Sequence, residues 1–338
     1  ARLGEDGERR WAETAVALIR QSFPNESWEV ASWPTCERLF PHALVAAGHA
    51  ERLGVADETT GWLLSRAAAY LRARGQYQQA KPIIERALAF TEAALGAADP
   101  EVAWRCDEFG HVLFELGDLA GARAQYERAV EIGEAALGSN HEDMATWRSN
   151  LGGVLRALGV RGGARAQLER ALEIGEATRG PNHRYATTWH GNLGSVLQDL
   201  GDLEGARAQF EQGLAIGEAV RGPDHPTVAS LRGSLGGALQ DLGDLEGARA
   251  QVEHALEITE AAFGLDHPDV AIWRGKLGGV LWALGDLEGA RAQYERALAV
   301  SEAALGHDHP TVAAIRDNLN GVLQALQAAT PEDPASAV

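Results

Sequence analysis

Apolar residues recur along most of this chain at helical spacing, in a pattern that repeats every 42 positions. In the unit from His267 to Gly306, the first half places apolar side chains at Val270, Trp273, Leu277, Val280, Leu281 and Leu284, and the second half at Leu287, Ala290, Tyr294, Ala297, Leu298 and Val300. Such spacing puts the apolar residues on one face of a helix. The pattern therefore predicts two amphipathic helices in each unit.

The expected ends of both helices carry residues that start or stop helices. His267 is followed by Pro268 and Asp269; proline fits the first helical position, and an acid suits the positive end of the helix dipole. Gly285 and Gly306 stand where the two helices are expected to end, and glycine is common just past a helix. Each unit is therefore predicted to be a helical hairpin.

The same short stretch joins the two helices in several units. The stretch LGDLEGARAQ starts at Leu200, Leu242 and Leu284, and looser copies start at Leu116, Leu158 and Ala73. A single hairpin cannot bury its apolar face alone, whereas stacked hairpins bury one another's faces in a continuous core. The recurring residues are thus explained by a packing joint that recurs from hairpin to hairpin.

The repeat divides the chain into three parts. Residues 56–327 are predicted to form six hairpins plus an unpaired closing helix. Residues 1–55 do not follow the period, and they are predicted to form two helices, about Asp6–Ser22 and Pro34–Leu53, joined by a loop with the sequence FPNESWEVASWP. Residues 328–338, with the sequence AATPEDPASAV, are predicted to be a disordered tail.

Small residues at fixed positions give the repeat its resemblance to a known family. Gly278, Leu281, Ala290, Tyr294 and Ala297 match the spacing of the tetratricopeptide repeat signature. The match recurs at Gly110, Ala122, Tyr126 and Ala129, at Gly152, Ala164, Leu168 and Ala171, at Gly194, Ala206, Phe210 and Gly213, and at Gly236, Ala248, Val252 and Ala255. A unit of this length, with an extended second helix, resembles the kinesin light chain subclass. The resemblance implies an all-α, right-handed superhelical solenoid.

The segment before the repeats, residues 1–55, carries a second resemblance. Its stretches ERRWAETAVALIRQSFP and WPTCERLFPHALVAAGHAE are similar to the helical region that joins the nucleotide-binding module to the repeats in bacterial STAND ATPases, which include actinobacterial NB-ARC proteins. The chain also starts without Met, and its only methionine is Met144. Together these features suggest an excised segment of a longer signalling protein whose catalytic core lies elsewhere.

Composition narrows the classes of partner. A formal net charge of -18 argues against general affinity for nucleic acid or anionic lipid, because phosphate groups are held mainly by clustered Lys and Arg. There is no run of about 18 apolar residues that would span a membrane. The two cysteines, Cys36 and Cys106, lack the spacing of metal ligands and are expected to be buried thiols. We expect a cytoplasmic protein.

Catalytic and cofactor motifs do not emerge. Neither Lys81 nor Lys276 follows the glycine-rich loop of a phosphate-binding site. Histidines recur once in each unit, at His141, His183, His225, His267 and His309, too far apart for shared metal ligation, and are predicted to be turn and cap residues. Paired glycines such as Gly152 with Gly153 and Gly278 with Gly279 are predicted to permit close helix packing. We therefore expect no enzyme activity, no cofactor and no metal.

Positions that differ between the copies indicate where a partner binds. In the tetratricopeptide family the first helix of each hairpin lines a concave groove, so equivalent positions here are candidate contacts. They are Trp62, Arg66, Arg72, Trp104, Asp107, His111, Phe114, Asn150, Arg156, Asn192, Gln198, Gln240, Lys276, Trp282 and Asn318. Trp and Arg dominate interface energetics, and Asn side chains hold extended backbone. The alternative for Trp62 and Trp104 is packing against the preceding N-terminal helices.

These observations lead to two functional hypotheses. In the first, the chain is a protein- or peptide-binding module that serves as the ligand-sensing arm of a STAND-type ATPase. In the second, it is a stand-alone scaffold or adaptor, similar in role to kinesin light chain. A P-loop encoded upstream would favour the first hypothesis. The pattern predicts neither the identity of the ligand nor an oligomeric state.

Overall fold

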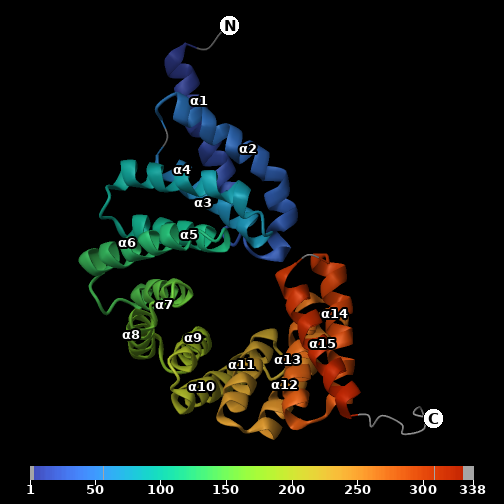
Figure 1. The fold of residues 1–338 in the computed structure, drawn as a ribbon. Coiled ribbons are helices and arrows are strands. Elements are labelled where there is room, and N and C mark those ends of the chain that lie inside the picture. Colours follow the sequence, from blue (N-terminus) through green and yellow to red (C-terminus); the bar gives the residue numbers. More distant parts are fainter. Residues whose placement is uncertain (1–3, 56, 308, 330–338) are drawn as a thin grey trace, which may run out of the picture. The chain divides into compact units, whose positions relative to one another are not determined.

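The computed structural model describes residues 4–55, 57–307 and 309–329, and throughout this part of the chain the regular structure is helical without strands (Figure 1). The elements are α1 (Glu5–Ser22), the 3-10 turn η1 (Val30–Ser32), α2 (Trp33–Arg52), α3 (Glu58–Ala73), α4 (Tyr77–Leu95), α5 (Pro100–Glu115), α6 (Leu119–Leu137), α7 (Glu142–Ala157), α8 (Arg161–Arg179), α9 (Ala186–Asp199), α10 (Leu203–Arg221), α11 (Pro226–Leu242), α12 (Leu245–Phe263), α13 (Pro268–Leu284), α14 (Leu287–Leu305) and α15 (Pro310–Ala329). The prediction of an all-α fold is confirmed.

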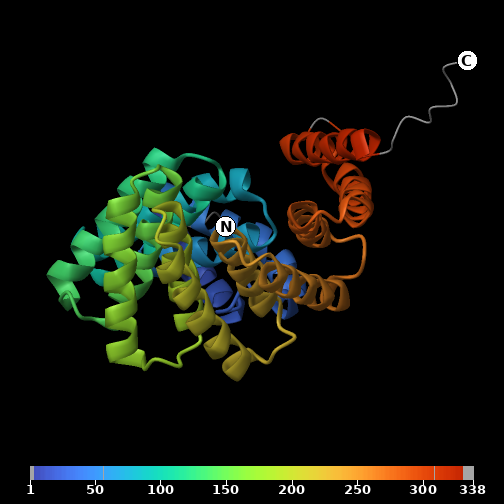
Figure 2. The same cartoon turned by 60° about the horizontal axis from the view of Figure 1, so that its bottom comes forward.

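The chain forms two compact units, residues 1–178 and residues 179–338. In unit 1, α1 packs on α2 and both contact α3, and the hairpins α3–α4 and α5–α6 follow, with α4 against α5 and α6 against α7. In unit 2 the hairpins are α9–α10, α11–α12 and α13–α14, and α15 packs on α14. Figure 1 and Figure 2 both show α13, α14 and α15 side by side.

The two helices of a hairpin meet where a glycine of the first helix faces a large side chain of the second. A Cβ atom added at Gly194 would lie 2.7 Å from the Phe210 ring, a distance that sterics forbid. Ala206 and Ala248, on the second helices, are fully buried at the same joint. Gly152 and Gly278 make the predicted close approaches, to Leu168 and Tyr294. Gly153 does not, because a Cβ atom there would meet open space.

Caps and turns follow the sequence closely. The aspartate of each LGDLEG stretch accepts a hydrogen bond from the glycine N–H three positions on, as in Asp202 to Gly205 at 3.0 Å. Four of the recurring histidines cap first helices: the Thr227 N–H donates to His225 Nδ1 at 3.1 Å, and His141, His267 and His309 accept in the same way. His183 accepts from the Tyr185 N–H at 3.3 Å in the turn before α9, whose N-cap is Tyr185. The predicted role of these histidines is confirmed.

Glycines with positive φ recur at a constant spacing of half a unit, from Gly54 to Gly306, so that each of them follows a helix. Gly243 is one example: its φ of 87° and ψ of 2° lie in the left-handed region, which side chains with a Cβ disfavour. The first helix and the second helix, each with its following turn, therefore take equal lengths of chain. The period of the sequence consists of two equal half-units.

Arginines near the middle of the first helices tie each hairpin to the one before it. Arg148 of α7 pairs with Glu134 of α6 and donates to Gln167 of α8 at 2.6 Å. The same arrangement recurs in unit 2 at Arg232 and Arg274. Each of these guanidinium groups is nearly buried, so it is held against two neighbouring helices and helps to fix the register of the stack.

The structure also bears on the predictions about cysteines, metal sites, membrane spans and the division of the chain. Both cysteines are buried free thiols, as predicted. Over the described residues, His, Cys, Asp and Glu side chains form no group of three or more that could hold a metal ion. The same part of the chain contains no helix long and apolar enough to cross a membrane. The division at residues 55 and 327 stays a prediction, and most of the predicted tail, 330–338, lies outside the described residues.

Candidate functional site

The first helices of unit 1 form a charged cluster that includes one of the predicted groove residues, Arg66. Glu108 on α5 lies at its centre. Its carboxylate pairs with Arg66 of α3 at 2.5 Å and with Arg105 at 3.0 Å, and it accepts a hydrogen bond from Ser65 Oγ at 2.6 Å. Burial raises the pKa of Glu108, but the two guanidinium groups outweigh burial and hold the pKa below its usual range. Glu108 therefore stays charged and cross-links α3 and α5.

The loop between α1 and α2 covers part of this cluster. Ser27 is fully buried, and its hydroxyl donates to the Arg66 carbonyl at 2.7 Å. In return, Arg66 donates to the Asn25 carbonyl at 3.3 Å, and its guanidinium lies over the Trp28 ring at 5.3 Å. Arg66 is consequently engaged by the chain itself. In unit 1 the face of α3 at this position is closed by residues 25–28.

A second cluster of polar side chains lies between α5 and α7. The Asn150 amide of α7 donates to Asp107 Oδ1 at 2.7 Å and lies 3.2 Å from His111 Nε2. Burial raises the pKa of Asp107 to about 7, although the hydrogen bond from Asn150 opposes the rise. Burial also lowers the pKa of His111 to about 4, so this imidazole is neutral at physiological pH. Asp107 is only 4% exposed, and its carboxylate holds the Asn150 amide.

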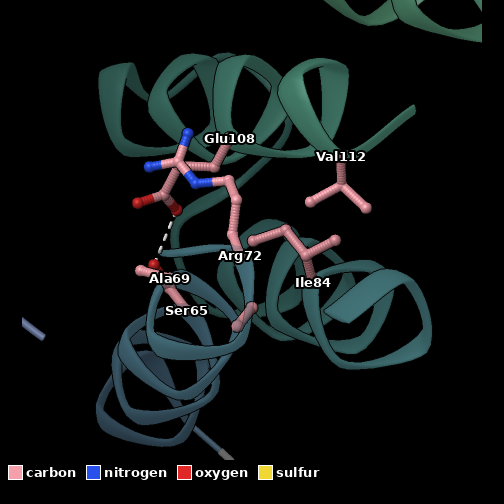
Figure 3. Close-up of a pocket in the computed structure, with 7 residues that line it drawn as sticks. Ser65, Ala69, Arg72, Ile84, Glu108 and Val112 are labelled. Carbon is pink, nitrogen blue, oxygen red and sulfur yellow. Dashed lines mark hydrogen bonds between the residues drawn. The ribbon is translucent and has the colours of Figure 1, made fainter. Parts of the chain in front are cut away.

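Two hollows flank the cluster, and Arg72 of α3 lines both of them. The first is narrow and lies between α3, α4 and α5, where Figure 3 shows the Arg72 side chain extending towards the side on which Glu108 lies. The second is open to solvent, and it is lined by Trp28, Arg72, Ala73, Tyr77, His111 and Glu115. An indole, a phenol, a guanidinium group, a neutral imidazole and a carboxylate thus surround one opening.

The remaining predicted residues of unit 1 are placed differently. Trp62 lies under the Arg20 guanidinium of α1 at 4.9 Å, which agrees with the packing alternative. Trp104 packs forward instead, edge-on against Trp147 of α7 with 5.3 Å between ring centroids. Phe114 is half-buried and Arg156 is exposed.

Predicted residues of unit 2 are more dispersed. Gln198 donates to Asp241 at 2.6 Å. Lys276 donates to the Gly233 carbonyl at 3.3 Å and lies over the Trp273 ring at 4.9 Å, and burial lowers its pKa. The Trp282 indole rests on Gly321, where a Cβ atom would come within 2.6 Å of it. Asn192 and Gln240 are half-buried, and Asn318 is exposed.

Four residues of this region, Ser65, Glu108, Tyr77 and Trp28, are not among the residues predicted from the sequence. The period of the sequence could have indicated Glu108, because Arg66 and Glu108 are one period apart and occupy equivalent positions on adjacent first helices. Opposite charges one period apart predict a pair across the stack. No such clue existed for Trp28, which lies in a loop outside the repeat.

Comparisons with known proteins agree with this architecture. Profiles described as tetratricopeptide repeat match residues 60–101, 106–177, 143–216, 184–261, 227–303 and 269–328. A comparison with curated protein sequences gives no match.

Solved structures show the same fold. BtubC (BKLC) from P. vanneervenii is 21% identical, with a TM-score of 0.55 over 75% of this chain and 92% of that chain. A putative kinesin light chain from Podospora anserina with nearly identical repeats is 22% identical, with a TM-score of 0.51 over 59% and 94% of the two chains. A Rap protein complexed with competence and sporulation factor is 13% identical, with a TM-score of 0.58 over 95% and 87%.

These structural likenesses support the fold, and the profile matches extend over well more than half of the sequence. Tetratricopeptide repeats are protein-interaction modules, and proteins built from them are generally scaffolds without enzyme activity. The chain belongs to the tetratricopeptide repeat family.

Proposed function

We propose that this chain binds a protein or peptide segment along the first helices of unit 1, from the opening at Arg72 to Asn150. The observation that carries the proposal is the open hollow between Trp28, Arg72 and His111, next to the Asn150 amide. Aromatic and arginine side chains around a partly desolvated opening are the usual anchors of an interface. The site starts beyond Arg66, because residues 25–28 cover that position.

Asn150 is proposed to hold the backbone of the bound segment. Its amide nitrogen is already used by Asp107 and His111, so its orientation is fixed before a partner arrives. That arrangement leaves the amide oxygen to accept a hydrogen bond from a backbone N–H, at little cost in side-chain entropy. Phe114, half-buried on the same helix as His111, supplies apolar contact.

The finer form of the proposal is that this module is the ligand-sensing arm of a STAND-type ATPase, in which ligand binding shifts the arm between two arrangements and so controls the ATPase core. Its support is the resemblance of the segments around Trp11 and Trp33 to the linker of such proteins. The alternative is an adaptor without a switch, which the kinesin-light-chain-like neighbour favours. Sequencing upstream of the encoding region discriminates these two, since only the first requires a P-loop.

The groove is tested with the double substitution Phe114→Ala and Asn150→Ala. Partners captured by the wild-type chain should bind this variant about 1 to 4 kcal/mol more weakly, because an apolar anchor and a backbone hydrogen bond are lost. The matched control is Glu204→Ala with Glu246→Ala, two exposed positions of α10 and α12. Affinity is measured by calorimetry and the thermal midpoint on the same samples.

Two outcomes would contradict the proposal. Unchanged affinity of the double variant would move the binding surface away from these helices. A large fall in the thermal midpoint, with binding lost in proportion, would show that Phe114 and Asn150 are core residues.

A further inference from the structure

The helices α1 and α2 expose an apolar face at the start of unit 1 (Figure 1). Both helices contact α3, and yet Trp11 and Leu18 of α1 are 61% and 57% exposed, and Val45 of α2 is 60% exposed. Single exposed apolar residues are common on protein surfaces, whereas a patch of several large ones marks a contact with another protein.

The exposed side chains belong to one continuous face. Trp11, Ala15 and Leu18 are spaced as residues on one side of a helix, and Val45 lies one turn before His49 on α2. A hollow between the two helices joins these stripes. Its volume including the open mouth is about 770 Å³, and it is lined by Glu8, Trp11, Ala12, Ala15, Ala46, His49, Arg52 and Leu53. We call this hollow, together with Leu18 and Val45, the α1–α2 face.

The α1–α2 face carries little of the negative charge of the chain. Among the residues that line the hollow, Glu8 pairs with Arg52 at 3.9 Å, and Arg52 lies 3.4 Å from His49 Nδ1. By helical spacing, the positions beside the face are uncharged or basic, and they include Gly7, Thr14 and Gln21 of α1 and Arg38, Pro41, His42 and Gly48 of α2. A chain with a formal net charge of -18 repels a second copy over most of its surface. Two copies therefore approach most easily here.

The size and the shape of the face also fit a second copy. Because α1 has 18 residues, the face is about 27 Å long, and two helices side by side make it about 20 Å wide. Two copies that covered it would bury about 1,100 Å² together, near the lower limit for a specific interface. The exposed Trp11 indole lies beside small residues of the hollow, Ala15 and Ala46, so a two-fold axis would let each indole enter the hollow of the other copy.

We infer that the α1–α2 face binds a second copy of this chain, so that the two helix pairs form a four-helix bundle around a two-fold axis. Trp11 of each copy would pack over Ala15 and Ala46 of the other. The dimer goes beyond the proposed binding at Arg72 and Asn150 and does not depend on it. Where both hold, the dimer carries two binding sites, so a partner with two segments binds more tightly than a partner with one.

Sedimentation equilibrium of the full chain tests the dimer. The wild type should show a reversible monomer–dimer equilibrium in the micromolar range, and Trp11→Glu should raise the dissociation constant about tenfold or more, because a carboxylate replaces the central indole. The matched control is Leu265→Glu in unit 2, which adds the same charge at a position that is 60% exposed and should leave the dissociation constant almost unchanged. High salt should tighten the wild-type dimer, since it screens the like charges of the two chains.

Any of four results would overturn the inference: a wild type that stays monomeric up to about 1 mM, an unchanged dissociation constant for Trp11→Glu, a dimer that high salt weakens, or a mass that rises beyond that of a dimer. The last would indicate head-to-tail association. If Trp11→Glu does not fold, as judged by circular dichroism, Val45→Glu gives the same test. The Phe114→Ala and Asn150→Ala variant should dimerise normally, so failure here is distinguishable from failure of the proposed peptide binding.

Discussion

The first helices of unit 1 and unit 2 share their packing residues and differ on the face beside them. At one position of the repeat, the first helices of unit 1 carry Arg66, Glu108 and Asn150, and those of unit 2 carry Asn192, Ser234 and Lys276. At the preceding position, unit 1 has Ser65, Asp107 and Ser149, whereas unit 2 has three glycines, Gly191, Gly233 and Gly275. In unit 1 the charged side chains bond from helix to helix. In unit 2, Lys276 of α13 donates instead to a backbone group, the Gly233 carbonyl of α11.

This difference teaches that one repeat scaffold carries two kinds of surface. Unit 1 is cross-linked through largely buried charges, as where Glu108 of α5 pairs with Arg66 of α3. Unit 2 relies on glycine for close approach, as where Trp273 lies against Gly233. The scaffold is set by the small residues of the joint, and each face can then vary without disturbing the stack.

The largest expected effect comes from breaking the charge cluster of unit 1. Glu108→Ala removes the carboxylate shared by Arg66 and Arg105, which leaves two largely buried guanidinium groups without it. The free energy of unfolding should fall by about 3 to 5 kcal/mol. The equivalent change in unit 2, Ser234→Ala, should cost less than about 0.5 kcal/mol. Urea unfolding of both variants tests the contrast, and equal losses would show that the two faces do not differ in this way.

Substitutions that add bulk at the hairpin joint should lower stability equally in different hairpins, unlike substitutions on the face that carries the variable positions. Ala206→Leu and Ala248→Leu each add bulk at a fully buried position and should cost roughly 1 to 3 kcal/mol through overpacking. Thermal and urea unfolding give the values. A neutral result for either would mean that the joint has room that its full burial does not suggest.

The pH dependence of Asp107 sharpens the comparison, since unit 2 has glycine at that position. An unfolded Asp titrates near pH 4, and the pKa of Asp107 is raised to about 7, so the folded state binds the extra proton between these values. The contribution of Asp107 to stability therefore falls as pH rises from about 4 to 7. His111 has the opposite sign, because its pKa is lowered to about 4, and its contribution rises from about pH 4 to 6.5.

Asp107→Asn removes the pH dependence that comes from Asp107 and keeps the one that comes from His111. Relative to the wild type, this variant should gain stability by up to about 3 kcal/mol as pH rises from 4 to 7, and then stay level. Denaturant unfolding at four pH values across this window provides the measurement. Parallel profiles for the two proteins would mean that Asp107 ionises normally in the folded state.

The smallest effect is expected on the second helices, whose exposed faces look alike in both units. Arg123 with Glu127 in unit 1 and Arg249 with Glu253 in unit 2 are exposed pairs, each one helical turn apart. Arg123→Ala and Arg249→Ala should each leave the urea midpoint almost unchanged, and any small loss should disappear in high salt, because exposed pairs are screened. A clear loss of stability in one unit alone would extend the difference between the units to this face.

The sequence alone determined the helical hairpins, their caps and their joints. These features depend on residues close together in the chain, such as Asp202 and Gly205 or His225 and Thr227, or on a period that repeats their spacing. It also determined which helix face carries variable residues. The groove residues themselves were predicted by position, and Asn150 with His111 was brought together as that position implies.

Only the tertiary structure decided what those variable residues do. Arg66 is covered by the loop that contains Ser27, far earlier in the chain, and no periodicity extends to that loop. The Asp107 carboxylate meets the Asn150 amide of the next hairpin. Trp104 packs edge-on against Trp147, whereas Ser230, at the equivalent position of unit 2, supplies no ring to Trp273. Each outcome depends on which side chains meet across neighbouring helices, and such contacts are set by three-dimensional packing and not by local spacing.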